Sequence, residues 1–179
     1  MKIIKKILLA LVSIIAILLL VALFTAKEYA VVRSITINKT PAEVYDYVKY
    51  LKNQDYYSVW VQRDPNVKKE YRGTDATVGF VSAWESKMEE VGKGEQEITK
   101  MEPNSRIDYE LRFIEPFEAK DNAYMTFEPA EANATKVSWG FNGKMPYPMN
   151  LMLLFMDMDG MLGKDLQQGL DNLKGVLEK

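Results

Sequence analysis

The chain has 179 residues, of which 47% are hydrophobic and 27% are charged, a balance typical of a folded globular protein and not of a disordered one. It contains no cysteine and no histidine. This composition excludes disulfide scaffolds, thiol nucleophiles and histidine-dependent catalytic triads, and it removes the commonest protein ligand of metals. We therefore expect no metal site and no cofactor.

The N-terminal segment, residues 1–26, is predicted to be a transmembrane anchor. Ile7 to Phe24 is a run of 18 residues without a charge. As a helix this run spans roughly 27 Å, about the thickness of a bilayer core. A cleaved signal peptide is the alternative, but Phe24 fits poorly at two positions before a cleavage after Ala26.

Charge predicts how the rest of the chain lies relative to the membrane. Lys2, Lys5 and Lys6 precede the apolar run, so the positive-inside rule places the N-terminus in the cytoplasm. Residues 27–179 are then a single domain on the extracytoplasmic side of the cytoplasmic membrane, held by a single pass. Without those three lysines the chain has 20 basic and 25 acidic residues, a net charge of −5, which argues against nucleic acid as a partner.

Residues 31–141 predict two short helices and an antiparallel sheet. Alternation of apolar and polar residues indicates strands at 31–37, 78–84, 95–101, 107–113, 123–127 and 137–141. After the first strand, Thr40 and Glu43 form a capping box around Pro41, which predicts the start of a helix. Residues 53–60 are predicted to form a second short helix or turn. Lys68, Lys69 and Arg72 are interpreted as a small exposed charge cluster.

The C-terminal segment from Met149 to Lys179 is predicted to form one long helix around which the sheet folds. Leucines at 162, 166, 170, 173 and 177 share one helical face, and polar residues occupy the opposite face. Residues 149–161 are almost wholly apolar. The predicted fold is α+β: a curved antiparallel sheet of about six to seven strands wrapped around a long C-terminal helix.

This order of elements resembles the helix-grip fold of the SRPBCC superfamily, which includes START lipid-transfer domains and polyketide cyclase-like proteins. The resemblance rests on the strand-and-helix opening from Ile35 to Val48, on Trp60, and on the segments 79–84, 135–139 and 163–174. The resemblance covers residues 31 to about 178. Within the superfamily, the chain is most similar to the polyketide cyclase-like branch that is common in bacteria. A membrane anchor is not part of the core family pattern.

The resemblance implies a cavity between the sheet and the C-terminal helix that holds an apolar small molecule or lipid. Six of the ten methionines lie between Met145 and Met161, and methionine suits an adaptable apolar wall. The side chains that we predict to line the cavity are Trp60, Phe80, Trp84, Tyr109, Phe113, Phe127, Trp139, Met152 and Met156. These residues could instead simply fill a core. A third interpretation is that residues 147–155 touch the membrane beside the anchor, although Asp157 and Asp159 argue against deep insertion.

Candidates for catalysis are few, and we predict no catalytic residue. Glu95 and Glu97 share one face of a strand, but their polar neighbours favour a solvated face. Tyr109 is a possible proton donor, although a buried tyrosine with a satisfied hydroxyl is the better interpretation. The sequence therefore predicts a membrane-anchored domain that binds a lipid-like or other apolar molecule. The alternatives are a cyclase- or hydrolase-like enzyme with polar groups converging in the cavity, and an interaction domain with a filled core.

Overall fold

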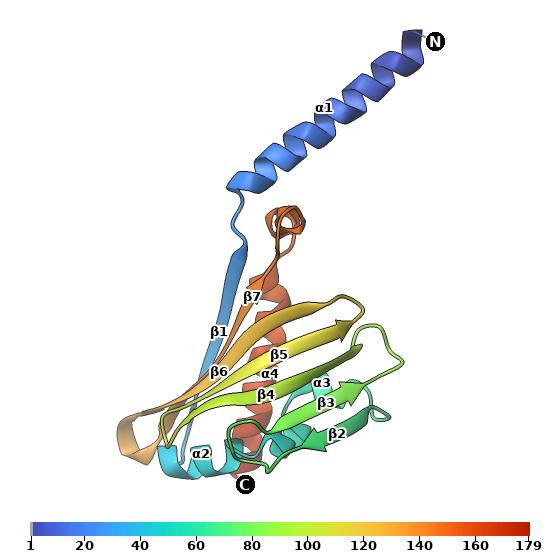
Figure 1. Ribbon diagram of the computed structural model, residues 1–179. Helices are drawn as coiled ribbons and strands as arrows, with labels where there is room; N and C mark the ends of the chain where they lie inside the picture. The colour runs from blue at the N-terminus through green and yellow to red at the C-terminus, as the bar shows by residue number, and fades with distance from the viewer. Residues whose placement is uncertain (1) are drawn as a thin grey trace.

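The computed structural model describes residues 2–179 as an N-terminal helix that leads into a domain with one seven-stranded sheet (Figure 1). The sheet is antiparallel throughout, in the order β1-β7-β6-β5-β4-β3-β2. Its strands are β1 (Glu28–Ile37), β2 (Lys68–Arg72), β3 (Val81–Glu85), β4 (Lys93–Glu102), β5 (Arg106–Glu115), β6 (Ala119–Pro129) and β7 (Thr135–Lys144). The helical elements are α1 (Lys2–Phe24), α2 (Pro41–Val48), η1 (Leu51–Tyr56), α3 (Val59–Gln62), η2 (Glu131–Asn133), η3 (Met149–Leu154) and α4 (Met158–Leu177).

The predicted helix-grip fold is confirmed. Figure 1 shows the sheet curving around α4, with α2 across one end of the sheet and α1 leaving the domain beside the first residues of β1. Strands β1 and β7 pair over their whole length, from Glu28 opposite Lys144 to Ile37 opposite Thr135. The first and last strands of the chain are therefore neighbours, and the short β2 and β3 form the far edge of the sheet.

Local sequence explains where α2 begins. The Thr40 hydroxyl accepts a hydrogen bond from the backbone N–H of Glu43, and the Glu43 carboxylate accepts one from the backbone N–H of Thr40 (2.9 Å). Pro41 takes the first helical position, where its missing N–H costs nothing. The predicted capping box is present, and it turns the chain directly from β1 into α2.

The prediction of one helix from Met149 to Lys179 is wrong. The chain forms the short 3₁₀ helix η3, and α4 begins only at Met158. Asp157 is the N-cap of α4, because its carboxylate accepts a hydrogen bond from the backbone N–H of Gly160 (2.8 Å). A capping aspartate interrupts the helix at a point where the hydrophobic pattern alone runs on.

Two strand predictions need correction at the β2–β3 edge. Lys68 and Lys69, interpreted as an exposed charge cluster together with Arg72, form the edge strand β2, which pairs with β3. Strand β3 starts at Val81 and not at Val78, since Gly79 has a positive φ of 87° that is incompatible with a strand. Charged side chains on an exposed edge strand discourage pairing with other chains, which is why β2 lacks the usual strand composition.

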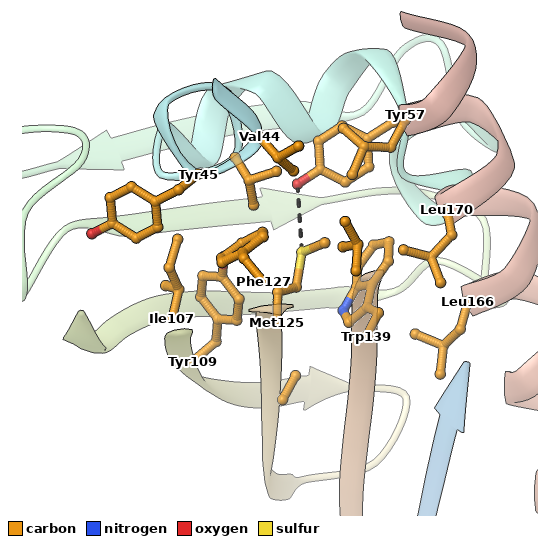
Figure 2. Packing of buried hydrophobic residues seen from close by; sticks show 14 of the residues in the cluster. Val44, Tyr45, Tyr57, Ile107, Tyr109, Met125, Phe127, Trp139, Leu166 and Leu170 are labelled. Atoms are coloured by element: carbon orange, nitrogen blue, oxygen red, sulfur yellow. Dashed lines mark hydrogen bonds between the residues drawn. The ribbon is translucent and has the colours of Figure 1, made fainter. Parts of the chain in front are cut away.

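The end of the domain that carries α2 is filled by a packed hydrophobic core (Figure 2). Tyr45 packs edge-on against Phe127, with ring centroids 5.7 Å apart, and Tyr57 packs edge-on against Trp139 at 5.8 Å. The Tyr57 hydroxyl approaches the Met125 sulfur at 4.0 Å. Leu166, Leu170 and Leu173 close this core from α4, as their helical spacing predicts.

Candidate ligand-binding cavity

A cavity lies between the sheet and α4, beyond the packed core at the α2 end of the domain. This cavity, of about 340 Å³, lies between the inner face of the sheet, α3 and the first half of α4. This volume is within the range of small-molecule sites. Most of the wall is apolar, with Leu111, Ala123 and Phe141 on the strands and Leu162 and Leu166 on α4. The fold thus combines a filled core at one end with a cavity at the other.

Aromatic side chains form the two long walls of the cavity. On the sheet, Trp84 and Phe113 meet edge-to-face with centroids 6.1 Å apart, and the Trp84 indole N–H donates to the Val91 carbonyl (3.1 Å). A Cβ on the opposing Gly94 would lie 2.6 Å from the Trp84 ring, so glycine is needed there for the ring to lie against the strand. Opposite, Trp60 of α3 packs edge-on against Trp139 at 5.9 Å.

Tyr29 and Asp121 bring polar chemistry to the end of the cavity nearest α1. Both residues line the cavity, and Asp121 is only 6% exposed. Burial raises the pKa of the Asp121 carboxyl, although the backbone N–H of Lys144 donates to it (3.0 Å). Burial and the neighbouring Asp121 carboxylate together raise the pKa of Tyr29 to about 12. At neutral pH the tyrosine therefore keeps its proton, and the neighbouring carboxyl holds a proton more readily than usual.

A second set of polar residues lines the cavity away from Tyr29 and Asp121. Gln54, Ser58, Ser82 and Gln96 line the cavity from η1, the turn after it, β3 and β4. The Gln54 side-chain Nε2 is buried without a hydrogen-bond partner within residues 2–179. The cavity meets solvent where exposed residues join its wall. These are Glu89 and Glu90 in the β3–β4 turn, Glu115 at the end of β5, and Pro116 in the turn that follows. The interior is therefore apolar with polar groups at two places, as suits a molecule that is mostly hydrocarbon.

The structure divides the nine predicted lining residues into three groups. Trp60, Trp84, Phe113 and Trp139 lie on the cavity wall. Phe80, Tyr109 and Phe127 lie in the packed core, each at most 2% exposed. Met152 of η3 and Met156 after it do not line the cavity. They precede α4, the helix that covers the sheet, which begins only at Met158. Whether any of the nine contacts a ligand stays a prediction.

The side chains considered for acid–base chemistry lie elsewhere. Glu95 and Glu97 are on the outer face of β4, where Arg112 donates to both (2.6 and 2.8 Å). They belong to a surface ion-pair cluster, as their neighbours indicated. Tyr109 is in the core, and its hydroxyl has no hydrogen-bond partner among residues 2–179, so the expectation of a satisfied hydroxyl is wrong. Burial raises the pKa of Tyr109 well above its ordinary value.

Three inward-facing polar residues on β1 and β6 were not among the predicted site residues: Tyr29, Arg33 and Asp121. Extending the alternation of the 31–37 strand back by two positions reaches Tyr29, and extending that of the 123–127 strand back by two reaches Asp121. Arg33 was within the predicted strand. It faces α4, where its guanidinium passes over Gly163 and forms an ion pair with Asp159 (2.8 Å). The strand periods could have found all three, since a period of two places every second residue on the inner face.

Helix α1 projects from the domain as a helix of 23 residues, long and apolar enough to cross a membrane. Of its described residues only Ala22 is buried. A membrane span and a signal sequence share these properties.

Comparisons with known proteins agree with the fold. A family model described as "Polyketide cyclase / dehydrase and lipid transport" matches residues 29–178. No curated protein matches the chain. Among solved structures, a protein of Nitrosospira multiformis is 13% identical with a TM-score of 0.61, covering 83% of this chain and 96% of its own. A Mesorhizobium loti protein is 16% identical with a TM-score of 0.60, covering 84% and 97%. A Thermus thermophilus protein is 16% identical with a TM-score of 0.58, covering 83% and 97%.

Proposed function

The chain belongs to the polyketide cyclase / dehydrase and lipid transport family, and from this premise we propose that it is a membrane-anchored binding domain for a lipid-like or other apolar molecule. The single observation that carries the proposal is the cavity of about 340 Å³ between the sheet and α4, walled mainly by apolar side chains. A domain selected only to be stable would close such a space, because each cavity in a core costs free energy. The cavity therefore supports a binding domain over the alternative of an interaction domain with a filled core.

The anchor is the second part of this proposal. We take α1 as an uncleaved span with its N-terminal lysines in the cytoplasm and the domain on the extracytoplasmic side. Support comes from contacts that α1 makes with the domain. The Asn150 side chain of η3 donates to the carbonyl oxygens of Ala22 and Thr25, which a tether destined for removal would not need.

Catalysis is the second candidate function, and the observation that favours it is the pair Tyr29 and Asp121. A protonatable carboxyl beside a tyrosine in an apolar cavity could move a proton to or from a bound molecule. The two functions differ in one outcome. A carrier releases the molecule that it bound, whereas an enzyme with this pair would release an altered molecule.

The test is native mass spectrometry of the full-length chain, purified in a mild detergent and compared with two variants. Ser82→Trp fills the cavity from β3, because Ser82 lines the wall. Ala83→Trp is the matched control, since it adds the same side chain at the next position of β3, which is on the outer face opposite Glu95. We expect a co-purifying apolar molecule in the wild type and in Ala83→Trp, and its loss in Ser82→Trp.

Two results would overturn parts of the proposal. An empty wild-type protein that also takes up no apolar dye would contradict binding. A bound molecule that differs chemically between the wild type and Asp121→Asn would favour the enzyme over the carrier, because removing the acid group would then leave the substrate unconverted.

A further inference from the structure

An uncharged apolar segment is exposed on the surface next to α1. Residues 145–156 contain no charged side chain. Within them Phe155 is 83% exposed, and four other apolar residues are each more than two-fifths exposed: Tyr147, Met149, Met152 and Leu154. We refer to these five side chains as the η3 surface. Exposed apolar side chains gathered in one short segment indicate a surface that something covers.

The structure fixes the η3 surface at the end of α1. Asn150, in the middle of η3, is fully buried and donates to the Ala22 carbonyl at 2.7 Å and to the Thr25 carbonyl at 3.0 Å. These carbonyls belong to the last turn of α1 and the residue after it, where no intrahelical partner remains. Figure 1 shows η3 beside that end of α1, at the end of the domain from which the helix leaves.

This position identifies what covers the segment. If α1 spans a bilayer, its apolar run ends at Phe24, and a segment bonded to Ala22 and Thr25 lies at the membrane–water boundary. We propose that the η3 surface inserts into the interfacial layer of the same bilayer and is covered by lipid. The inference rests on the proposed anchoring by α1, and it adds a second, peripheral attachment of the domain to the membrane.

The acidic residues that follow η3 do not oppose a shallow insertion. Asp157 is occupied in capping α4, and the Asp159 carboxylate is paired with Arg33 on the sheet. On the other side of the segment, Lys144 pairs with Glu28 (2.7 Å). The η3 surface is therefore an uncharged patch bounded by satisfied charges, the arrangement of an interfacial element that dips only into the headgroup and upper acyl region.

The same geometry brings the cavity close to the membrane. Tyr29, on the cavity wall, follows Thr25 by four residues, so its Cα lies at most about 14 Å from that of Thr25. Phe117 in the β5–β6 turn is 80% exposed and adjoins Glu115 and Pro116 at the rim of the cavity. The Tyr29 side of the cavity thus lies toward the end of the domain that carries the η3 surface.

Because the chain has no cysteine, a fluorophore attached to a single introduced cysteine reports the environment of that position alone. Three variants of the full-length protein each carry one cysteine: Phe155→Cys, Val78→Cys or Ser13→Cys. Each cysteine is labelled with an environment-sensitive fluorophore, and the protein is reconstituted into phosphatidylcholine liposomes. Val78 is a matched control, since it is an exposed apolar residue in the β2–β3 loop, away from α1. Ser13 reports whether α1 itself is in the bilayer. Quenching is measured with iodide in the water and with spin-labelled lipids.

We expect lipid-borne quenchers near the headgroup to quench the label at position 155 several-fold more than the label at position 78, and iodide to show the opposite order. A label at 155 that iodide reaches as well as at 78, while the label at 13 is quenched from the bilayer, would overturn this inference and leave the anchor standing. A label at 13 that lipid quenchers do not reach would overturn both. Protection of 155 from iodide without lipid quenching, rising with protein density in the membrane, would assign the surface to a second copy and refute the proposal.

Discussion

The side-chain nitrogen of Asn150 donates hydrogen bonds to the carbonyl oxygens of Ala22 (2.7 Å) and Thr25 (3.0 Å), so a residue near the C-terminal end of the sheet domain caps the N-terminal helix. Asn150 and Ala22 are 128 positions apart in the sequence, and their hydrogen bond satisfies a carbonyl in the last turn of α1. The helix is consequently not a simple tether, because its last carbonyls depend on the folded domain for their hydrogen bonds.

Asn150→Ala should release η3 from α1. The substitution leaves the buried Ala22 carbonyl without its partner, which costs about 1–3 kcal/mol, and the loss falls locally on this contact. Amide hydrogen exchange of the full-length protein in detergent should therefore accelerate in residues 149–156 and remain unchanged in β4 and β5. Asn142→Ala, on the exposed outer side of β7, serves as the control and should change neither region. Equal exchange in the two variants would show that the contact does not hold η3.

Glycine at 169 should be required for packing, whereas glycine at 175 should not. A Cβ on Gly169 would lie 2.8 Å from the buried Trp139 ring, while a Cβ on Gly175 would meet nothing within 4 Å. Both substitutions to alanine gain up to about 1 kcal/mol of helix propensity. Overpacking against Trp139 costs about 1–3 kcal/mol and should outweigh that gain.

Denaturant titrations check this pair. Gly175→Ala should raise the free energy of unfolding and Gly169→Ala should lower it, with a change in the tryptophan fluorescence of the second variant alone. Equal gains in the two variants would mean that Trp139 moves freely into the cavity.

Tyr109→Phe should stabilise the protein. The Tyr109 hydroxyl is buried without a partner within residues 2–179, so its removal relieves a desolvation cost of about 1 kcal/mol or more. Tyr57→Phe is the matched control, since the Tyr57 hydroxyl contacts the Met125 sulfur at 4.0 Å and should contribute little in either direction. A loss of stability in Tyr109→Phe would reveal a hydrogen bond through bound water or ligand.

Asp121→Asn should make the protein more stable at neutral pH, with a gain that disappears in acid. Burial raises the pKa of Asp121 in the folded state, so ionisation above that pKa opposes folding. Below the unfolded pKa of about 3.9 the carboxyl is protonated in both states, and wild type and variant should agree. Asparagine keeps the acceptor for the Lys144 N–H, so the comparison isolates the charge.

Asp159→Asn should change the stability in the opposite direction, making the protein less stable at neutral pH. The Arg33 guanidinium lowers the pKa of the Asp159 carboxyl, so its contribution is present at neutral pH and is lost as the pH falls through the folded pKa. Urea titrations between pH 2 and 7 should show Asp121→Asn above the wild type and Asp159→Asn below it at pH 7. All three proteins should converge only at the acid end, below the lowered pKa of Asp159 in the folded state. Parallel curves would show that neither carboxyl titrates differently in the folded state.

Much of the architecture follows from short-range patterns. The capping box at Thr40 and Glu43, the alternation of residues 107–113 and the leucine spacing from Leu162 onward each predict one element, and each element is present. The edge strand β2 escaped prediction because an edge strand exposed to solvent needs no apolar face. The break at Asp157 escaped because a polar cap is a single residue against a long apolar run.

The cavity depended on tertiary structure. Apolar inner positions look alike in sequence whether they fill a core, as Phe80 and Phe127 do, or line a void, as Trp84 and Phe113 do. Which of them face empty space depends on how far α4 lies from each part of the sheet, a distance set by contacts such as Trp139 against Gly169 and Arg33 across Gly163.

The amino-acid sequence by itself determined that an apolar helix precedes an α+β domain of the helix-grip kind, because these features depend on periods of a few residues and on local caps. Only the tertiary structure decided that Tyr29 and Asp121 line the same cavity and that η3 is bonded to α1. These relationships join residues about a hundred positions apart, and no local pattern encodes a distance that the packing of the whole domain sets.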